Sequence, residues 1–141
     1  MKKGIFIVLL LMIIFLVGCT KKESSNYEES MDSVEDKEGI YEKISVEEAK
    51  NIIDNSQYDV ILDVRSLEEY NEGHIENAIL IPSNELKDKA ETILVDKDAV
   101  ILVYCRSGRR SASAAKELIH MGYTKVYDFG GIIDWPYEIM K

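Results

Sequence analysis

The sequence predicts an α/β domain: a mostly parallel sheet with helices on both faces, arranged as a three-layer sandwich. Segments 58–64 and 99–104 are continuous apolar runs rich in β-branched residues, which is typical of strands buried on both faces. Segments 78–82 and 125–129 are two further predicted strands. Helix-forming segments lie before and between the strands, and this alternation indicates parallel strands joined by helical crossovers.

Four predicted helices are recognised by the residues at their ends. Each helix is expected to open at or near a serine, and these serines are Ser45, Ser66, Ser83 and Ser111. Glu48 and Glu69 follow the first two serines by three residues, which is the pattern of a capping box. Gly122 follows the last helix and suits the position just after a helix end. The chain therefore carries helical segments of ordinary length next to every predicted strand.

The first residues have the pattern of a cleaved leader. Lys2 and Lys3 precede an apolar stretch over 5–17 that is shorter than the ~20 residues of a membrane-spanning helix. The stretch ends in "LVGC", which resembles the lipobox of bacterial lipoproteins. That resemblance implies a signal peptide over 1–18 that is removed, and a lipid with palmitate-type acyl chains on Cys19. The lipid would anchor the protein at the extracytoplasmic face of a bacterial membrane. The alternative is an ordinary secreted leader with an incidental cysteine.

Composition indicates one globular domain on an acidic tether. The chain has 141 residues, 46% of them apolar, and a net charge of −9 that becomes −11 once Lys2 and Lys3 leave with the leader. This acidity argues against a nucleic-acid partner and against binding to anionic lipid by charge. Residues 19–39 are read as the lipidated N-terminus followed by a disordered tether with few aliphatic side chains. A short acidic interaction segment is the alternative for this stretch. Residues 40–141 remain as the domain.

The segment "YCRSGRRS" places a cysteine at the carboxyl end of an apolar strand and immediately before a helix. Ligands of such sheets bind beyond the carboxyl ends of the strands. We expect the helix to start near Ser111, so residues 106–110 must turn sharply, and Gly108 permits such a turn. Backbone N–H groups, the helix dipole and three arginines would then favour a Cys105 thiolate, which is the nucleophilic form.

Two plainer interpretations of this segment stay open. Cys105 could be an inert side chain that fills a strand end, although this leaves three arginines and a glycine within five residues unexplained. The arginines could be a solvated helix start, and this alternative is strongest for Arg106. If Cys19 carries lipid, Cys105 is the one thiol of the mature chain. An internal disulfide or a two-cysteine reductase is then excluded.

Three stretches of the sequence together resemble the rhodanese-like sulfurtransferases, over residues 44–140. "CRSGRRS" resembles the active-site loop of that family. "LDVRSLEEYNEGHIENAILIP" and "GYTKVYDFGGIIDWP" resemble its first and closing signatures. The matching positions are Asp63, Val64, Arg65, Glu69, Gly73, His74, Ile75, Ala78, Ile81, Pro82, Gly122, Tyr123, Val126, Gly130, Gly131 and Trp135. Asn77 stands where the family usually has glycine, and asparagine tolerates the positive φ that this turn requires.

The resemblance implies transfer of a sulfane sulfur. Cys105 would take sulfur from thiosulfate or a polysulfide as a persulfide and pass it to cyanide or a thiol. The substrate-binding residues would be the rest of the loop: Arg106, Ser107, Gly108, Arg109, Arg110 and Ser111. Arg109 and Arg110 are the candidates to hold an anionic donor. Beyond this persulfide, no cofactor is implied.

Two other function classes remain open. One is a phosphatase or arsenate reductase, since related folds use a cysteine and an arginine to bind oxyanions. In those phosphatases five residues separate the cysteine from the arginine, whereas four separate Cys105 from Arg110. The shorter loop favours a single sulfur atom over a phosphoryl group. The other class is a module that senses or carries sulfur without turnover.

Further polar residues are expected to support the structure. Asp63 and Arg65 follow an apolar strand, and we expect a buried ion pair that fixes the next loop. His74 is expected to orient a turn, and His120 to lie on the surface. The sequence has no Cys/His cluster that would predict a metal site.

Overall fold

The computed structural model describes residues 38–141, so the predicted leader, Cys19 and most of the predicted tether lie outside the described residues. Its sheet has five parallel strands in the order β1-β5-β4-β2-β3. The strands are β1 (Ile40–Lys43), β2 (Val60–Asp63), β3 (Ala78–Leu80), β4 (Val100–Cys105) and β5 (Lys125–Gly131). The predicted α/β class and parallel sheet are therefore confirmed.

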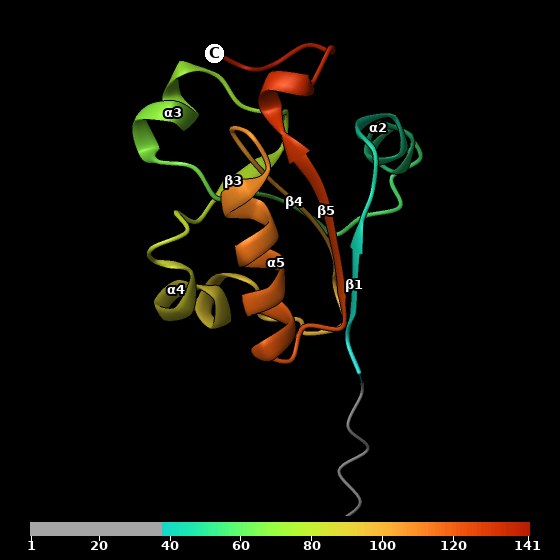
Figure 1. Ribbon diagram of the computed structural model, residues 1–141, viewed down its shortest axis with the longest axis vertical. Helices are drawn as coiled ribbons and strands as arrows, with labels where there is room; N and C mark the ends of the chain where they lie inside the picture. Colours follow the sequence, from blue (N-terminus) through green and yellow to red (C-terminus); the bar gives the residue numbers. More distant parts are fainter. Residues whose placement is uncertain (1–37) are drawn as a thin grey trace, which may run out of the picture. The chain divides into compact units, whose positions relative to one another are not determined.

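Helices cover both faces of the sheet, as predicted. The helices are α2 (Val46–Asp54), α3 (Leu67–Glu72), α4 (Leu86–Ile93) and α5 (Arg109–His120), with a 3-10 turn, η1 (Ile132–Asp134), after β5. Figure 1 shows α4 and α5 on one side of the sheet and α2 on the other. Among the described residues, no helix has the length and apolar character to span a membrane.

Two apolar cores lie on the two faces of the sheet. One joins alternate side chains of β4 to Ala114, Ala115 and Leu118 of α5, and Cys105 belongs to it. The other core contains Ala49 of α2 and Trp135, which follows η1. The central strands β2 and β4 supply side chains to both cores, which explains why their sequences are continuous apolar runs.

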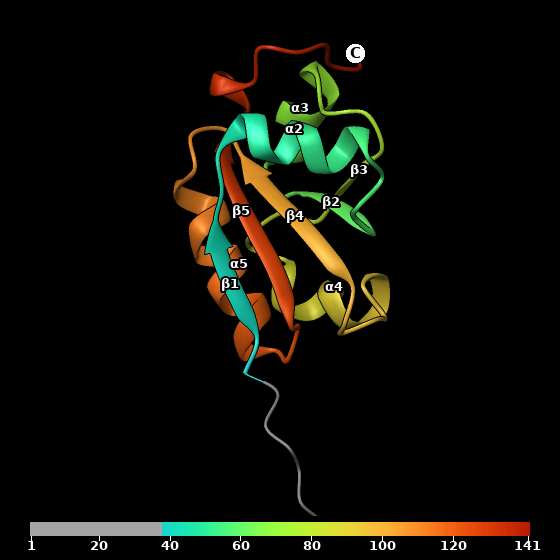
Figure 2. The same ribbon diagram turned by 90° about the vertical axis from the view of Figure 1, so that its right-hand side faces the viewer.

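All five strands run in the same direction, so their carboxyl ends lie along one border of the sheet, which we call the carboxyl edge. Figure 2 shows the arrowheads of β4 and β5 directed toward the end where α3, η1 and the C-terminus lie. Because the strands are parallel, Asp63 at the end of β2 and Cys105 at the end of β4 lie at this same edge. The topology thus gathers the polar residues singled out in the sequence at the carboxyl edge.

Two local predictions need correction, and one strand was missed. Ser83 does not cap α4: its N–H donates to the Val64 carbonyl at 3.1 Å, and the helix begins after Glu85 with no side-chain cap. Helix α5 begins at Arg109 rather than near Ser111, because Gly108 with φ of +94° turns the chain directly into the helix. Strand β1 was not predicted. It is the outermost strand beside β5, and its four residues are exposed and carry no clear apolar pattern.

Other end signals are present as expected. Ser66 and Glu69 form a complete capping box, and Ser45 accepts a hydrogen bond from the Glu48 N–H, which is one of the two bonds expected there. Gly122 follows α5 with φ of +90°. Asn77 has φ of +63°, which agrees with the expectation that asparagine can replace glycine in this turn.

Candidate active site

Cys105 lies at the end of β4, at the start of residues 105–110, which we call the catalytic loop after the family loop that they resemble. Its side chain is only 1% exposed. The Gly108 N–H donates to Sγ at 3.1 Å, and the Ser111 hydroxyl lies 3.7 Å from Sγ. The loop therefore closes around the sulfur atom from the side of the helix start.

The surroundings of Cys105 stabilise its thiolate. Burial by itself raises the pKa of the Cys105 thiol. Hydrogen bonds from Ser111 and from the backbone N–H groups of Ser107 and Gly108 outweigh burial, so the pKa lies below its ordinary value. The thiolate is the attacking form of cysteine, and the loop increases its fraction at neutral pH.

Two glycines of β5 allow the loop to pack tightly. A Cβ at Gly131 would lie 2.4 Å from the Arg106 carbonyl oxygen and 2.7 Å from the Ser107 Cα. Gly130 has φ of +89°, and its N–H donates to the Asp128 carboxylate at 3.0 Å. A larger residue at Gly131 would displace the loop that holds Cys105, whereas at Gly130 the positive φ is what disfavours other residues.

The structure separates the three arginines of the loop. Arg110 is held by Glu69 through two hydrogen bonds of 2.7 Å each. Arg106 and Arg109 are exposed. The sequence grouped Arg109 and Arg110 as candidates for an anionic donor, and the structure distinguishes them because two guanidinium nitrogens of Arg110 are bonded to Glu69.

Glu69 makes a contact with the Cys105 loop that the sequence analysis missed. The sequence identified it only as part of a capping box and of the first signature. Its carboxylate also joins α3 to the catalytic loop by binding Arg110, which is 41 positions away in the sequence. Hydrogen bonds from Arg110 lower the pKa of Glu69 to about 2, so it is ionised at neutral pH. No local sequence pattern indicates this pairing, because the two residues meet only at the carboxyl edge of the sheet.

Asp63 and Arg65 form the expected buried ion pair. The Arg65 guanidinium donates to the Asp63 carboxylate at 2.6 Å and to the Gly73 carbonyl at 2.7 Å. The Tyr104 ring lies beneath this guanidinium, 5.5 Å from it. These contacts fix the chain between β2 and the end of α3, so the pair supports the shape of the site.

Neither histidine is among the hydrogen-bond partners of the Cys105 sulfur, which include Gly108 and Ser111. His74 stacks on the Tyr70 ring with 3.8 Å between ring centroids, and its Nδ1 lies 3.0 Å from the Tyr70 carbonyl oxygen. His120 is exposed at the end of α5. Within residues 38–141, no group of three or more His, Cys, Asp or Glu side chains could hold a metal ion.

Comparison with known proteins agrees with this geometry. The model of the rhodanese-like domain family matches residues 45–136. The chain is 42% identical over 73 residues to thiosulfate sulfurtransferase PspE of Escherichia coli, covering 52% of this chain and 70% of PspE. It is 36% identical over 97 residues to thiosulfate sulfurtransferase GlpE of Coxiella burnetii, covering 68% of this chain and 88% of GlpE.

A solved structure shows the same arrangement of strands and helices. The structure described as rhodanese with anions from E. coli has a TM-score of 0.53 and 40% identity, and the match covers 58% of this chain and 96% of that one. The family match extends from the cap of α2 to the residue after Trp135, and so includes the whole catalytic loop. This chain belongs to the rhodanese-like domain family.

Proposed function

We propose that the protein is a rhodanese-type sulfurtransferase that uses Cys105 as its nucleophile. The observation that carries this proposal is the buried sulfur held by the Gly108 N–H at 3.1 Å, in a loop that lowers the pKa of the thiol. Relatives named thiosulfate sulfurtransferases support the same activity.

The proposed reaction has two steps. The Cys105 thiolate attacks the outer sulfur of thiosulfate, the sulfur–sulfur bond of the donor breaks, and sulfite leaves with the electron pair. Cyanide or a thiolate then attacks the outer sulfur of the Cys105 persulfide, and the electron pair of the broken bond returns to Cys105. The loop N–H groups stabilise the thiolate and the persulfide, and no oxidant is consumed.

Arg106 and Arg109 are the cations proposed to attract the donor. Both are exposed beside the loop, whereas Arg110 is committed to Glu69. A relative described as rhodanese with anions supports anion binding by this kind of domain. Arg110 acts instead through its position, since its positive charge interacts with the Cys105 sulfur.

The test uses the full chain carrying Cys19→Ser in detergent micelles, so that Cys105 is its one thiol. After incubation with thiosulfate or polysulfide, intact-mass analysis should show one added sulfur atom, and cyanide should remove it as thiocyanate. Cys105→Ser should show no adduct. A folded parent that stays unmodified with every donor would contradict the proposal, and a persulfide that no acceptor discharges would favour a sulfur-carrying module. Efficient aryl phosphate hydrolysis that depends on Cys105 would favour the oxyanion enzyme.

We also propose that a lipid on Cys19 anchors the mature protein to the outer face of a membrane. The leader pattern ending in "LVGC" supports this location. Fractionation should place the parent in membranes and should leave a Cys19→Ser variant unprocessed or release it. A Cys19→Ser protein that is cleaved and membrane-bound like the parent would contradict the anchor.

A further inference from the structure

The end of β5 forms a wall against which the catalytic loop packs. A Cβ placed on Gly108 would lie 3.3 Å from the Cα of Gly130, and a Cβ placed on Gly131 would lie 2.4 Å from the Arg106 carbonyl oxygen. The Ile133 N–H, two residues further along, donates to that same carbonyl at 3.2 Å. The position of the catalytic loop therefore depends on the path that the chain takes from Gly130 onward.

Strand β5 contains one extra residue at this point. Val103 of β4 pairs with Asp128, and Cys105 pairs with Gly131, so three steps along β5 match two steps along β4. This is the pattern of a β-bulge, which bends the strand and is frequent next to active sites. Gly130 lies within the bulge with φ of +89°, a conformation that glycine adopts without steric cost. The bulge therefore sets which backbone atoms of β5 face the catalytic loop.

The side chain of Asp128 holds this bulge from inside the protein. Asp128 is 0% exposed, and its Oδ1 accepts the Gly130 N–H at 3.0 Å. An aspartate oxygen bound to the N–H two residues later closes a local turn and restricts the chain between them. The other oxygen, Oδ2, has no hydrogen-bond partner within residues 38–141. Because a buried oxygen without a partner lowers stability, packing does not explain this carboxyl group, whereas the turn at Gly130 does.

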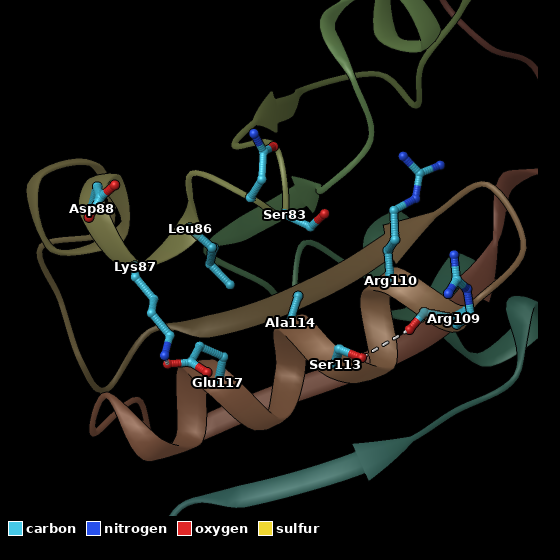
Figure 3. Close-up of a pocket in the computed structure, with 10 residues that line it drawn as sticks. Ser83, Leu86, Lys87, Asp88, Arg109, Arg110, Ser113, Ala114 and Glu117 are labelled. Atoms are coloured by element: carbon cyan, nitrogen blue, oxygen red, sulfur yellow. Dashed lines mark hydrogen bonds and ion pairs between the residues drawn. The ribbon is translucent and has the colours of Figure 1, made fainter.

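The start of α5 has an open flank and a packed flank. On the open flank, Arg109 and Arg110 line a groove of about 540 Å³ between α4 and α5 (Figure 3). On the packed flank, Ser111 is 0% exposed, and its hydroxyl lies 3.3 Å from the Gly130 carbonyl oxygen and 3.7 Å from the Cys105 sulfur. A chain of contacts thus runs from the turn at Gly130 through Ser111 to the reacting sulfur.

We propose that Asp128 is a positioning residue for Cys105: one carboxyl oxygen fixes the turn at Gly130, and this turn holds Ser111 and the catalytic loop around the sulfur. Its effect on sulfur transfer rests on the proposed function, whereas its effect on the reactivity of the thiol does not. The site requires from Asp128 an acceptor for one N–H group and not a negative charge. An amide oxygen accepts the same hydrogen bond, so asparagine should replace Asp128.

Alkylation of Cys105 tests the effect on the thiol. Full chains that carry Cys19→Ser, in detergent micelles, react with iodoacetamide over a range of pH, and the midpoint of the rate profile gives the pKa of the thiol. Asp128→Ala removes the acceptor and loosens the hydrogen bonds to the thiolate, so the midpoint should rise by about one pH unit. Asp128→Asn keeps the acceptor and should keep the parental midpoint. Asp128→Ser supplies a weaker acceptor and should give an intermediate midpoint.

A core variant separates positioning from loss of stability. Ile61→Val destabilises the core on the α2 side of the sheet, which does not include Cys105, and should keep the parental midpoint. A parental midpoint in Asp128→Ala, a shift in Asp128→Asn equal to that in Asp128→Ala, or an equal shift in Ile61→Val would overturn the proposal. If Asp128→Ala does not fold, Asp128→Ser takes its place, and a Ser midpoint equal to the Asn midpoint would overturn it.

Loading with thiosulfate tests the effect on sulfur transfer in the same variants. Below the midpoint, the rate of persulfide formation, followed by intact mass, should fall about threefold in Asp128→Ala, because a tenfold loss of thiolate is partly offset by the greater nucleophilicity of a more basic thiol. Asp128→Asn should load at the parental rate. An unchanged rate in Asp128→Ala beside an active parent would overturn the role in sulfur transfer. If the parent takes up no sulfur from any donor, the proposed function itself fails, and the alkylation midpoints still decide the role of Asp128.

Discussion

Two arginine–carboxylate pairs at the carboxyl edge have nearly the same length and different surroundings. Asp63 and Arg65 approach to 2.6 Å with side chains 0% and 6% exposed. Glu69 and Arg110 approach to 2.7 Å with side chains 23% and 31% exposed. The first pair is buried, so solvent cannot replace a lost partner. The second pair is partly exposed, so solvent can reach the partner that remains. We therefore expect the buried pair to control whether the edge folds, and the half-exposed pair to control how the catalytic loop is held.

The largest expected effect comes from breaking the buried pair. Arg65→Met leaves the Asp63 carboxylate buried without its partner and should lower the free energy of unfolding by about 3–5 kcal/mol. Urea denaturation followed by the fluorescence of Trp135 measures this change. The double variant Asp63→Leu/Arg65→Met should lose less than Arg65→Met alone, because no charge then remains buried. A single variant as stable as the parent would contradict the role given to this pair.

The half-exposed pair should have a smaller effect on stability. Glu69→Gln removes the carboxylate that binds Arg110 and should cost about 1 kcal/mol at pH 7. The folded-state pKa of Glu69, about 2, lies below its ordinary value. Its contribution is thus fully present above the ordinary value and is lost as pH falls toward 2. The difference between parent and variant should be constant from pH 7 to pH 5 and then shrink, and a difference that grows on acidification would refute this.

The smallest expected effect is on the thiol. Arg110→Gln removes a positive charge that interacts with Cys105, so the pKa of the thiol should rise. The rate of alkylation by iodoacetamide as a function of pH reports this pKa, and the midpoint for the parent should lie below the value of ~8.5 for a free cysteine. Arg106→Gln serves as the control for loss of one loop charge and should shift the midpoint less. An equal shift in both variants would mean that the Glu69–Arg110 pair gives Arg110 no special position.

The sequence predicted the central strands and the place of Cys105 at a strand end well, because local patterns determine them. Buried parallel strands must be apolar on both faces, and the runs at 58–64 and 99–104 show this directly. Strand β1 was missed for the opposite reason. It pairs with β5 at the sheet edge and exposes all four residues, so its existence depends on a partner more than eighty positions away.

The roles of the three arginines could not be predicted from their spacing. Arg106, Arg109 and Arg110 lie within five positions, and the sequence gives no reason to assign them different partners. The positive φ of Gly108 starts α5 at Arg109, and this start places Arg110 next to Glu69. The difference among the three arginines is therefore a consequence of where the helix begins.

By itself, the sequence determined the α/β class, the place of Cys105 at a strand end, the turn at Gly108 and the buried pair of Asp63 and Arg65. Each of these depends on residues within a few positions of one another, where backbone sterics and burial act locally. Only the tertiary structure decided that Glu69 holds Arg110, that Gly131 lies against the catalytic loop, and that α4 and α5 form a groove at Arg109. Those contacts join segments that are distant in sequence. They exist because parallel strands bring their carboxyl ends to one edge of the sheet.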